Sequence, residues 1–280
     1  MNPRKILQKY GLSPQKSLGQ NFLVDVNLAR RLVALSDLPP QATVIELGAG
    51  LGALTLALAE ASERVIAYEI DKGLIKALKA EGLPDNVCLR QGDILKLDWA
   101  DLARELDQKL IIFGNLPYYL TSPLLFSLLK ARKHLSFCTF MVQKEVADRL
   151  LASPGSRKYG LLSVFLGVWA EIRALMNLSP RCFWPPPKVS STAIKITFRL
   201  PDRRPKDEQW FMTLVKVAFS QRRKTLANAL KSLGIPRQKT EAALISLGLP
   251  VNIRPEALSP TDFVDLSEKL TPIFDQNGRV

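Results

Sequence analysis

Cysteine and histidine are scarce in this sequence. Its 280 residues include one histidine, His134, and three scattered cysteines, Cys88, Cys138 and Cys182. An odd, unclustered set of cysteines argues against disulfides and against a zinc site, and it indicates a reducing compartment. A single histidine also argues against catalysis that depends on histidine or on a bound metal. We therefore expect no metal.

Long apolar runs are absent as well. The longest, Leu161 to Ala170, is about half the length that spans a bilayer, so it predicts a core helix instead. The N-terminus has no apolar stretch followed by a small-residue cleavage site, as a secretory signal would have. We therefore expect a cytoplasmic protein that has no membrane partner.

Positive charge, in contrast, is in excess. The chain has 39 Lys and Arg against 26 Asp and Glu, which gives a net charge of +13. Such an imbalance favours a polyanionic partner, and nucleic acid is the first candidate. The length of the chain and its 47% hydrophobic residues are sufficient for one large domain and a smaller one.

Strand and helix patterns alternate from about residue 43 to residue 200. The alternation predicts a Rossmann-like α/β domain with a mostly parallel sheet, and the pattern of Ile194, Ile196 and Phe198 predicts an antiparallel strand at its end. After a proline-containing linker the pattern becomes helical. The predicted domains are residues 1–200 and a small all-helical domain of residues 206–280. The predicted strands are Thr43–Leu47, Arg64–Glu69, Val87–Gln91, Leu110–Gly114, Phe137–Gln143, Ala170–Asn177 and Ser190–Arg199.

Glycines, acids or amides follow the first four predicted strands. The glycine-rich turn Gly48-Ala49-Gly50-Leu51-Gly52 follows the first strand and allows a ligand to approach the backbone closely. Glu69 ends the second strand, where an acid receives ribose hydroxyls, whereas Asp71 is expected to cap the next helix. Asp93 follows the third strand and can accept a hydrogen bond from an adenine amine, and Asn115 follows the fourth. The pattern predicts a crevice that binds a nucleoside-type cofactor.

The stretch Asn115-Leu116-Pro117-Tyr118 indicates methyl transfer to an adenine amine. That amine is a poor nucleophile, because its lone pair is delocalised into the ring. The Asn115 side-chain oxygen and the Leu116 carbonyl can accept its two hydrogens and so free the lone pair. Pro117 would stiffen the turn, and Tyr118 would stack on the base. This chemistry favours S-adenosylmethionine over NAD as the cofactor, since a sulfonium cofactor needs no pyrophosphate-binding glycine pattern.

A basic stripe is predicted in the helical domain. Within a net charge of +13, such a stripe favours contact with phosphates over a merely solvated face. The run Arg222-Arg223-Lys224 is the predicted RNA contact. The residues that would share one continuous helical face are Lys216, Ser220, Arg223, Lys224, Ala227 and Lys231.

With these motifs the chain resembles the ribosomal RNA adenine N6-dimethyltransferases, most closely the KsgA (RsmA) branch, which acts on the small subunit. The resemblance implies S-adenosylmethionine-dependent N6-dimethylation of two adjacent adenosines in the 3′-terminal hairpin of 16S rRNA, with a role in ribosome biogenesis. It makes the first domain the catalytic methyltransferase domain and the helical domain the RNA-binding one, in a protein that we expect to be monomeric. Further segments that carry the resemblance are Lys16–Leu23, Gln143–Val146, Phe183–Val189 and Phe219–Leu226.

The resemblance also implies roles for single residues. Phe183 and Tyr118 would sandwich the extruded base, although Phe183 is also compatible with a place in the core. The predicted cofactor contacts are Asn21, Leu23, Gly48, Gly50, Glu69, Asp93 and Asn115. The predicted catalytic residues are Asn115, Leu116, Pro117, Tyr118 and Phe183.

Several alternatives remain open from the sequence. The tetrad at Asn115 is compatible with an ordinary strand-to-helix turn. A DNA adenine methyltransferase would share the tetrad chemistry, and the family also includes enzymes that methylate large-subunit rRNA. A non-catalytic assembly or checkpoint factor for the small subunit would share the positive charge.

Overall fold

The computed structural model describes residues 2–270, which form two compact units. The first unit comprises the chain up to residue 147 together with residues 171–198, and the second comprises residues 148–170 together with the chain from 199 onward. The predicted division was 1–200 and 206–280, so residues 148–170 are grouped differently from that prediction. Residues 271–280 of the predicted helical domain lie outside the described residues.

The grouping of residues 148–170 follows from the character of α8 (Leu161–Trp169), which is apolar on nearly every side. A helix of this kind needs partners around it. Phe165 and Trp169 pack on the ring of Phe211 from α9 (Glu208–Ser220), with ring centroids 5.8 and 5.6 Å apart. The prediction of a core helix here is confirmed.

None of the described helices combines the length and the apolar character needed to cross a bilayer.

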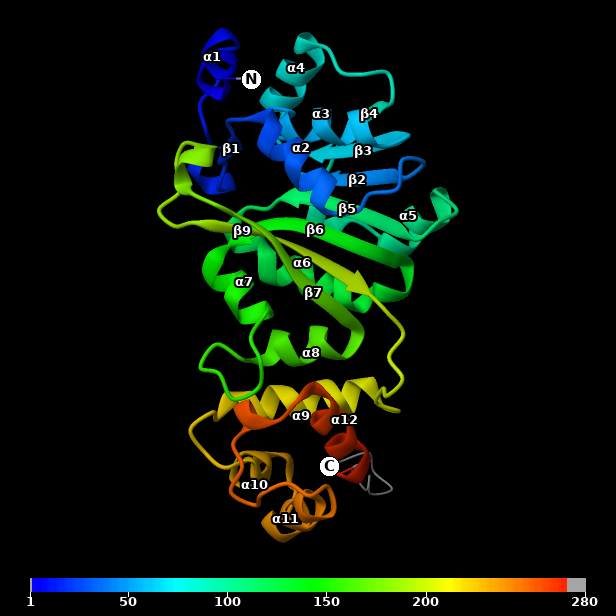
Figure 1. Cartoon of the computed structure of the whole chain (residues 1–280), viewed down its shortest axis with the longest axis vertical. Coiled ribbons are helices and arrows are strands. Elements are labelled where there is room, and N and C mark those ends of the chain that lie inside the picture. Colours follow the sequence, from blue (N-terminus) through cyan, green and yellow to red (C-terminus); the bar gives the residue numbers. More distant parts are fainter. Residues whose placement is uncertain (1, 271–280) are drawn as a thin grey trace. The chain divides into compact units, whose positions relative to one another are not determined.

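Seven strands form one sheet in the order β4-β3-β2-β5-β6-β9-β7 (Figure 1). β2 pairs in parallel with β3 and with β5. β3 also pairs in parallel with β4, and β5 pairs in parallel with β6. β6 and β9 pair antiparallel. The predicted sheet is confirmed, and the strand ends differ from the prediction by at most two residues. The strands are β2 (Thr43–Leu47), β3 (Arg64–Glu69), β4 (Val87–Gln91), β5 (Leu110–Asn115), β6 (Leu135–Gln143), β7 (Ala170–Leu178) and β9 (Ser191–Phe198).

The strand order reverses between β2 and β5. From β2 the chain steps outward to β3 and β4, and then it returns to β5 and β6 on the other side of β2. Because parallel crossovers are right-handed, the helices before and after this reversal cover opposite faces of the sheet. The helices of this part of the chain are α2 (Val26–Leu35), α3 (Ala53–Ala61), α4 (Lys72–Glu81), α5 (Trp99–Glu105), α6 (Thr121–Lys130) and α7 (Lys144–Leu150).

Alternating strand residues enter two apolar layers. Val44 and Phe113 are fully buried in a core cluster with residues of α2 and α3. Ile45 points to the opposite face, because successive strand residues alternate. On that side Trp99 of α5 donates from Nε1 to Ser127 Oγ of α6 at 2.8 Å. Both faces are therefore closed, and the carboxyl edge of the sheet is left for a ligand.

An N-terminal segment lies against this edge. Side-chain amides of Gln15 and Gln20 donate to Asp71 Oδ2 at 2.8 and 2.9 Å. Asp71 Oδ1 accepts from the N–H groups of Gly73 and Leu74, so the predicted capping of α4 is confirmed. The elements of the segment are α1 (Pro3–Lys9), a 3₁₀ turn (Lys16–Leu18) and β1 (Phe22–Leu23), which pairs antiparallel with β8 (Phe183–Trp184).

The second unit is helical in its described part. The predicted continuous face from Lys216 to Lys231 was wrong, since α9 ends at Ser220 and Ala227 is only 1% exposed. Tertiary contacts override the periodicity at this point, as the Leu226 N–H donates to the Ile253 carbonyl at 2.8 Å. Its further elements are α10 (Leu226–Ala229), a 3₁₀ turn (Leu230–Leu233), α11 (Arg237–Ser246) and α12 (Pro260–Lys269).

Candidate functional site

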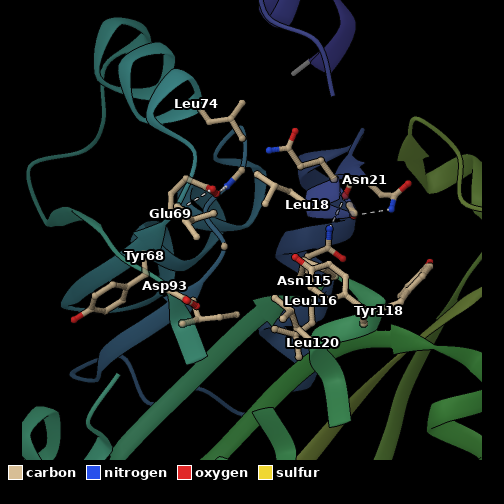
Figure 2. A pocket seen from close by; sticks show the side chains of 18 of the residues that line it. Leu18, Asn21, Tyr68, Glu69, Leu74, Asp93, Asn115, Leu116, Tyr118 and Leu120 are labelled. Atoms are coloured by element: carbon tan, nitrogen blue, oxygen red, sulfur yellow. Dashed lines mark hydrogen bonds between the residues drawn. The ribbon is translucent and has the colours of Figure 1, made fainter. Parts of the chain in front are cut away.

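A pocket of about 320 Å³ opens at the carboxyl ends of β2 to β5. It lies where the strand order reverses, which is where open α/β sheets bind ligands. Glu69 and Asp93 lie on one side of it, and Asn21, Asn115 and Tyr118 lie on the other (Figure 2). The predicted site residues that line the pocket are Asn21, Gly48, Gly50, Glu69, Asp93, Asn115, Leu116, Pro117, Tyr118 and Phe183.

The glycine-rich turn after β2 brings backbone to the pocket. Gly48 and Gly50 have φ values of 83° and 58°, in the left-handed region that side chains disfavour. A Cβ atom on Gly50 would lie 3.3 Å from the Phe22 ring, so a larger residue would press on the pocket wall. The turn is fixed by the N–H groups of Gly48 and Ala49, which donate to the Tyr68 carbonyl at 2.9 and 3.0 Å.

Glu69 ends β3 with its carboxylate against this turn. Its Oε2 accepts from the Gly50 N–H at 2.8 Å, and its Oε1 accepts from the N–H groups of Ile70 and Asp71 at 2.9 Å each. Burial raises the pKa of Glu69, and these hydrogen bonds act in the opposite direction. Because each carboxylate oxygen can accept two hydrogen bonds, Oε2 keeps one acceptor position for a ligand hydroxyl.

Asp93 follows β4 and begins a 3₁₀ turn (Ile94–Lys96). Its Oδ1 accepts from the Leu95 N–H at 3.0 Å, which fixes the orientation of the carboxylate. The pocket therefore has a second acid whose remaining oxygen can accept from a ligand amine.

Asn115 is oriented by its amide group. Its Nδ2 donates to the Asn21 carbonyl at 2.8 Å. Only the nitrogen end of an amide can donate, so this bond assigns Oδ1 as the end that is left as an acceptor. Asn21 is oriented in turn, since its own Nδ2 donates to the Gly19 carbonyl at 3.0 Å.

The two predicted stacking rings are held differently. The Tyr118 hydroxyl lies 3.1 Å from Ser191 Oγ on β9. Phe183 lines the pocket but is only 3% exposed and belongs to the core cluster, so it is both a wall and a core residue. Leu23 pairs with Phe183 in the β1–β8 sheet and does not line this pocket.

Three further apolar or aromatic residues of the pocket wall were not predicted. Ile70 directly follows Glu69 and is 47% exposed, and Leu95 follows Asp93 by two residues and is 40% exposed. Tyr119 is 56% exposed. Large apolar side chains that are exposed beside fixed acceptors suit a flat aromatic ligand. The signal in the sequence is an apolar residue soon after each of the acids Glu69 and Asp93.

The predicted RNA contacts lie in the second unit, in the turn between α9 and α10. Arg222 is half-buried, and its Nη2 donates to the carbonyls of Arg157 and Tyr159 at 3.2 and 2.9 Å. Arg223 and Lys224 are exposed. Arg222 therefore anchors the turn, and its two neighbours are presented to solvent.

Within the described part of the chain, no group of three or more His, Cys, Asp or Glu side chains could hold a metal ion. The three cysteines are free thiols. Burial raises the pKa of Cys138 well above its usual value, so this thiol remains a neutral core group.

The chain matches the model of a protein family described as ribosomal RNA adenine dimethylase over residues 11–271. It is 40% identical over 285 residues to the ribosomal RNA small subunit methyltransferase A of Desulfotalea psychrophila, covering 98% of this chain and 95% of the relative. It is 42% identical over 276 residues to the protein of that name in Desulfitobacterium hafniense, covering 97% of each chain.

Two solved structures are similar as well. The 23S rRNA methyltransferase ErmE is 27% identical, with a TM-score of 0.70 over 90% of this chain and 100% of that one. A dimethyladenosine transferase from Plasmodium falciparum shares the fold at 24% identity, with a TM-score of 0.71 over 88% of this chain and 95% of that one.

Proposed function

The chain belongs to the ribosomal RNA adenine dimethylase family, and from this premise we propose that it dimethylates N6 of two adjacent adenosines in the 3′-terminal hairpin of 16S rRNA. It is an S-adenosylmethionine-dependent rRNA adenine dimethyltransferase. Its target is the small ribosomal subunit, in whose biogenesis it takes part, so the reaction takes place in the cytoplasm. It acts as a monomer.

The residues of the pocket fit the methyl donor. The free acceptor position of Glu69 receives the ribose hydroxyls, and Asp93 accepts from the adenine amine between the apolar walls Ile70 and Leu95. The space beside Gly48 is open, because a Cβ atom placed there would meet nothing within 4 Å. The amino-acid part of the donor can therefore approach the backbone at this turn. Asn21 and Gly50 complete the contacts. When bound, S-adenosylmethionine supplies an electrophilic methyl group on a positively charged sulfur.

The acceptors at the end of β5 activate the substrate amine. Asn115 Oδ1 and the Leu116 carbonyl accept its two hydrogens, which draws the nitrogen towards tetrahedral geometry and exposes its lone pair. Pro117 keeps the two acceptors in a fixed turn. Because the alkylated amine is strongly acidic, no general base is required, and catalysis rests on positioning.

The target adenosine must leave its stack to reach these acceptors. Extrusion costs a few kcal/mol, and less for a loop base. Stacking against Tyr118 and Phe183 offsets this cost, since a stacked base is worth about 1–3 kcal/mol per ring. The helical domain, residues 206–280, binds the surrounding RNA, and Arg223 and Lys224 contact its phosphates.

One observation carries the proposal: Asn115 is fixed by its bond to the Asn21 carbonyl so that its acceptor end is available in a pocket that also holds Glu69 and Asp93. An ordinary strand-to-helix turn does not need an oriented amide beside two acids in one pocket.

Methylation of isolated ribosomal particles tests the substrate. The protein is incubated with methyl-labelled donor and with small subunits that lack dimethyladenosine, and the label is mapped in the RNA by mass spectrometry. We expect two dimethylated neighbours in the 3′-terminal hairpin of 16S rRNA. The Asn115→Ala protein is the matched control, and it should transfer almost no label.

The same experiment separates the competing functions. The likeness to ErmE favours large-subunit rRNA as the second candidate. Label in large subunits, or in DNA, contradicts the proposed substrate. Binding to small subunits without any transfer of label supports a non-catalytic assembly or checkpoint factor.

A further inference from the structure

A second, smaller cavity lies beneath the glycine-rich turn. Its volume is about 30 Å³, and Glu46 of β2 is part of its lining. The Glu46 side chain is 0% exposed, and neither of its carboxyl oxygens has a hydrogen-bond partner among the described residues. A buried carboxyl group without partners is costly, and such groups gather at functional sites.

Among the described residues, the lining of this cavity contains no charged side chain besides Glu46. β1, β5, β6 and α3 contribute apolar groups and the amide of Asn115 to this lining. Burial raises the pKa of Glu46 to about 8. The Thr55 hydroxyl of α3 lies near enough to Glu46 to lower this pKa, although in the described part of the chain neither group has a partner within normal hydrogen-bond limits. The nearby Glu69 carboxyl acts to raise the pKa of Glu46. Glu46 is therefore mainly neutral near pH 7.

The cavity and the larger pocket share part of their walls, namely Phe22, Gly48, Gly50 and Asn115. A cation bound beside Asn115 would therefore lie across this shared wall from Glu46. In such apolar surroundings opposite charges attract each other more strongly than they do in water. A positive ligand consequently favours the ionised form of Glu46.

We infer that Glu46 is a positioning residue that senses the charge of the methyl donor: its carboxyl group releases a proton to solvent when the cationic donor binds, and it takes up a proton when the donor has become a neutral thioether. The inference rests on the proposed place of the donor beside Asn115. S-Adenosylmethionine carries one more positive charge than S-adenosylhomocysteine, and the ionised Glu46 matches that charge. Methyl transfer removes the charge, so Glu46 favours the donor over the spent product.

Calorimetric titration of the full chain tests this directly. Titrations in buffers of different ionisation enthalpy give the number of protons released on binding. Near neutral pH, we expect S-adenosylmethionine to release up to about one proton more than S-adenosylhomocysteine. The two ligands share their amino and carboxyl groups, so their own titration largely cancels in the difference. Equal proton release for both ligands would overturn the inference.

The pH dependence of affinity gives a second readout. Below the Glu46 pKa of about 8, the ratio of the product Kd to the donor Kd should rise with pH, by up to tenfold per pH unit. Glu46→Gln has the shape of the neutral carboxyl group but cannot lose a proton, so its ratio should stay flat. Thr55→Val removes the hydroxyl that lowers the pKa, so the rise should move to higher pH. A rising ratio in Glu46→Gln would contradict the role of Glu46.

The outcomes distinguish the two proposals. Donor binding without a proton difference rejects the role of Glu46 and leaves the proposed function intact. Absence of donor binding at every pH rejects the proposed function itself. The wild-type calorimetry decides the question even if neither variant folds.

Discussion

At the scale of single residues, the two ends of the Asn115 amide have different tasks: the nitrogen end donates to the Asn21 carbonyl, and the oxygen end is the acceptor that we propose for the substrate amine. In Asn115→Ala we expect the single-turnover methylation rate to fall about 100- to 1,000-fold, as it does when one oriented group that stabilises a transition state is removed. Donor affinity should weaken but remain measurable, because the other cofactor contacts persist. Rapid-quench kinetics and calorimetry measure the two quantities.

Asn86 offers a matched control for this variant. Its Nδ2 also donates to backbone carbonyls, those of Ala59 and Ser62, at 2.9 and 3.1 Å, but it does not line the pocket. Asn86→Ala should lower stability by about 1–3 kcal/mol and leave the methylation rate unchanged. An Asn115→Ala protein with wild-type turnover would refute the acceptor role.

Phe183 combines a core position with a pocket position, so truncation to Ala confuses the two. Phe183→Leu retains most of the apolar volume and removes the ring. We expect a folded protein with normal donor affinity whose kcat/KM for RNA falls about 5- to 100-fold, the equivalent of one lost stacking contact. Phe113→Leu is the control, since this ring is fully buried in the same cluster and does not line the pocket. If both variants lose kcat/KM equally, Phe183 acts only through packing.

At the scale of elements, the N-terminal segment depends on Asp71, which caps α4 and accepts from Gln15 and Gln20. Asp71→Ala should cost about 0.5–2 kcal/mol of stability through the lost cap. It should also weaken donor binding, because the segment forms a pocket wall. Asp98 caps α5 in the same way, by accepting two backbone N–H groups, and it lies outside the pocket. Asp98→Ala should therefore cost stability alone, and equal donor affinities in the two variants would contradict this role.

The turn between α9 and α10 divides its basic residues between two tasks. Arg222→Ala should lower the free energy of unfolding by about 1–2 kcal/mol, because the guanidinium hydrogen bonds to the carbonyls of Arg157 and Tyr159 are lost. The double variant Arg223→Ala, Lys224→Ala should leave stability unchanged. Its RNA affinity should depend less steeply on salt, because about one phosphate contact is lost for each of the two residues. Binding isotherms at several salt concentrations measure the slope. An unaltered slope in the double variant would mean that these residues do not contact phosphates.

The elements that could be predicted are those with a strong local pattern. Buried strands such as Leu110–Asn115 form continuous apolar runs, and Asp71 has the position of a helix cap. The two-residue strands Phe22–Leu23 and Phe183–Trp184 are too short for any periodicity, and their pairing is a long-range contact. The end of α9 at Ser220 also depends on distant partners. The complete burial of Glu46 within its strand also depends on distant parts of the chain, so the sequence around it does not predict this burial.

At the scale of the whole molecule, Glu46 links stability to pH. Its pKa is raised to about 8 in the folded protein, so the folded state binds this proton more tightly than the unfolded state does. This contribution is present at low pH and is lost as pH rises towards 8. We expect the Glu46 contribution to the free energy of unfolding, without donor, to fall by up to about 1.4 kcal/mol per pH unit from about pH 5 to about pH 8. Urea denaturation measures it, and Glu46→Gln should remove the part of the slope that Glu46 contributes.

The pairing of β1 with β8 has a consequence for how the protein is made. Residues 22 and 23 find their partners only at positions 184 and 183. While the ribosome is still translating the intervening segment, β1 has no strand to pair with, although the residues around it can already contact Asp71 and Asn115. We therefore expect a newly made chain to complete this wall of the pocket late in translation, after most of the α/β sheet has already emerged.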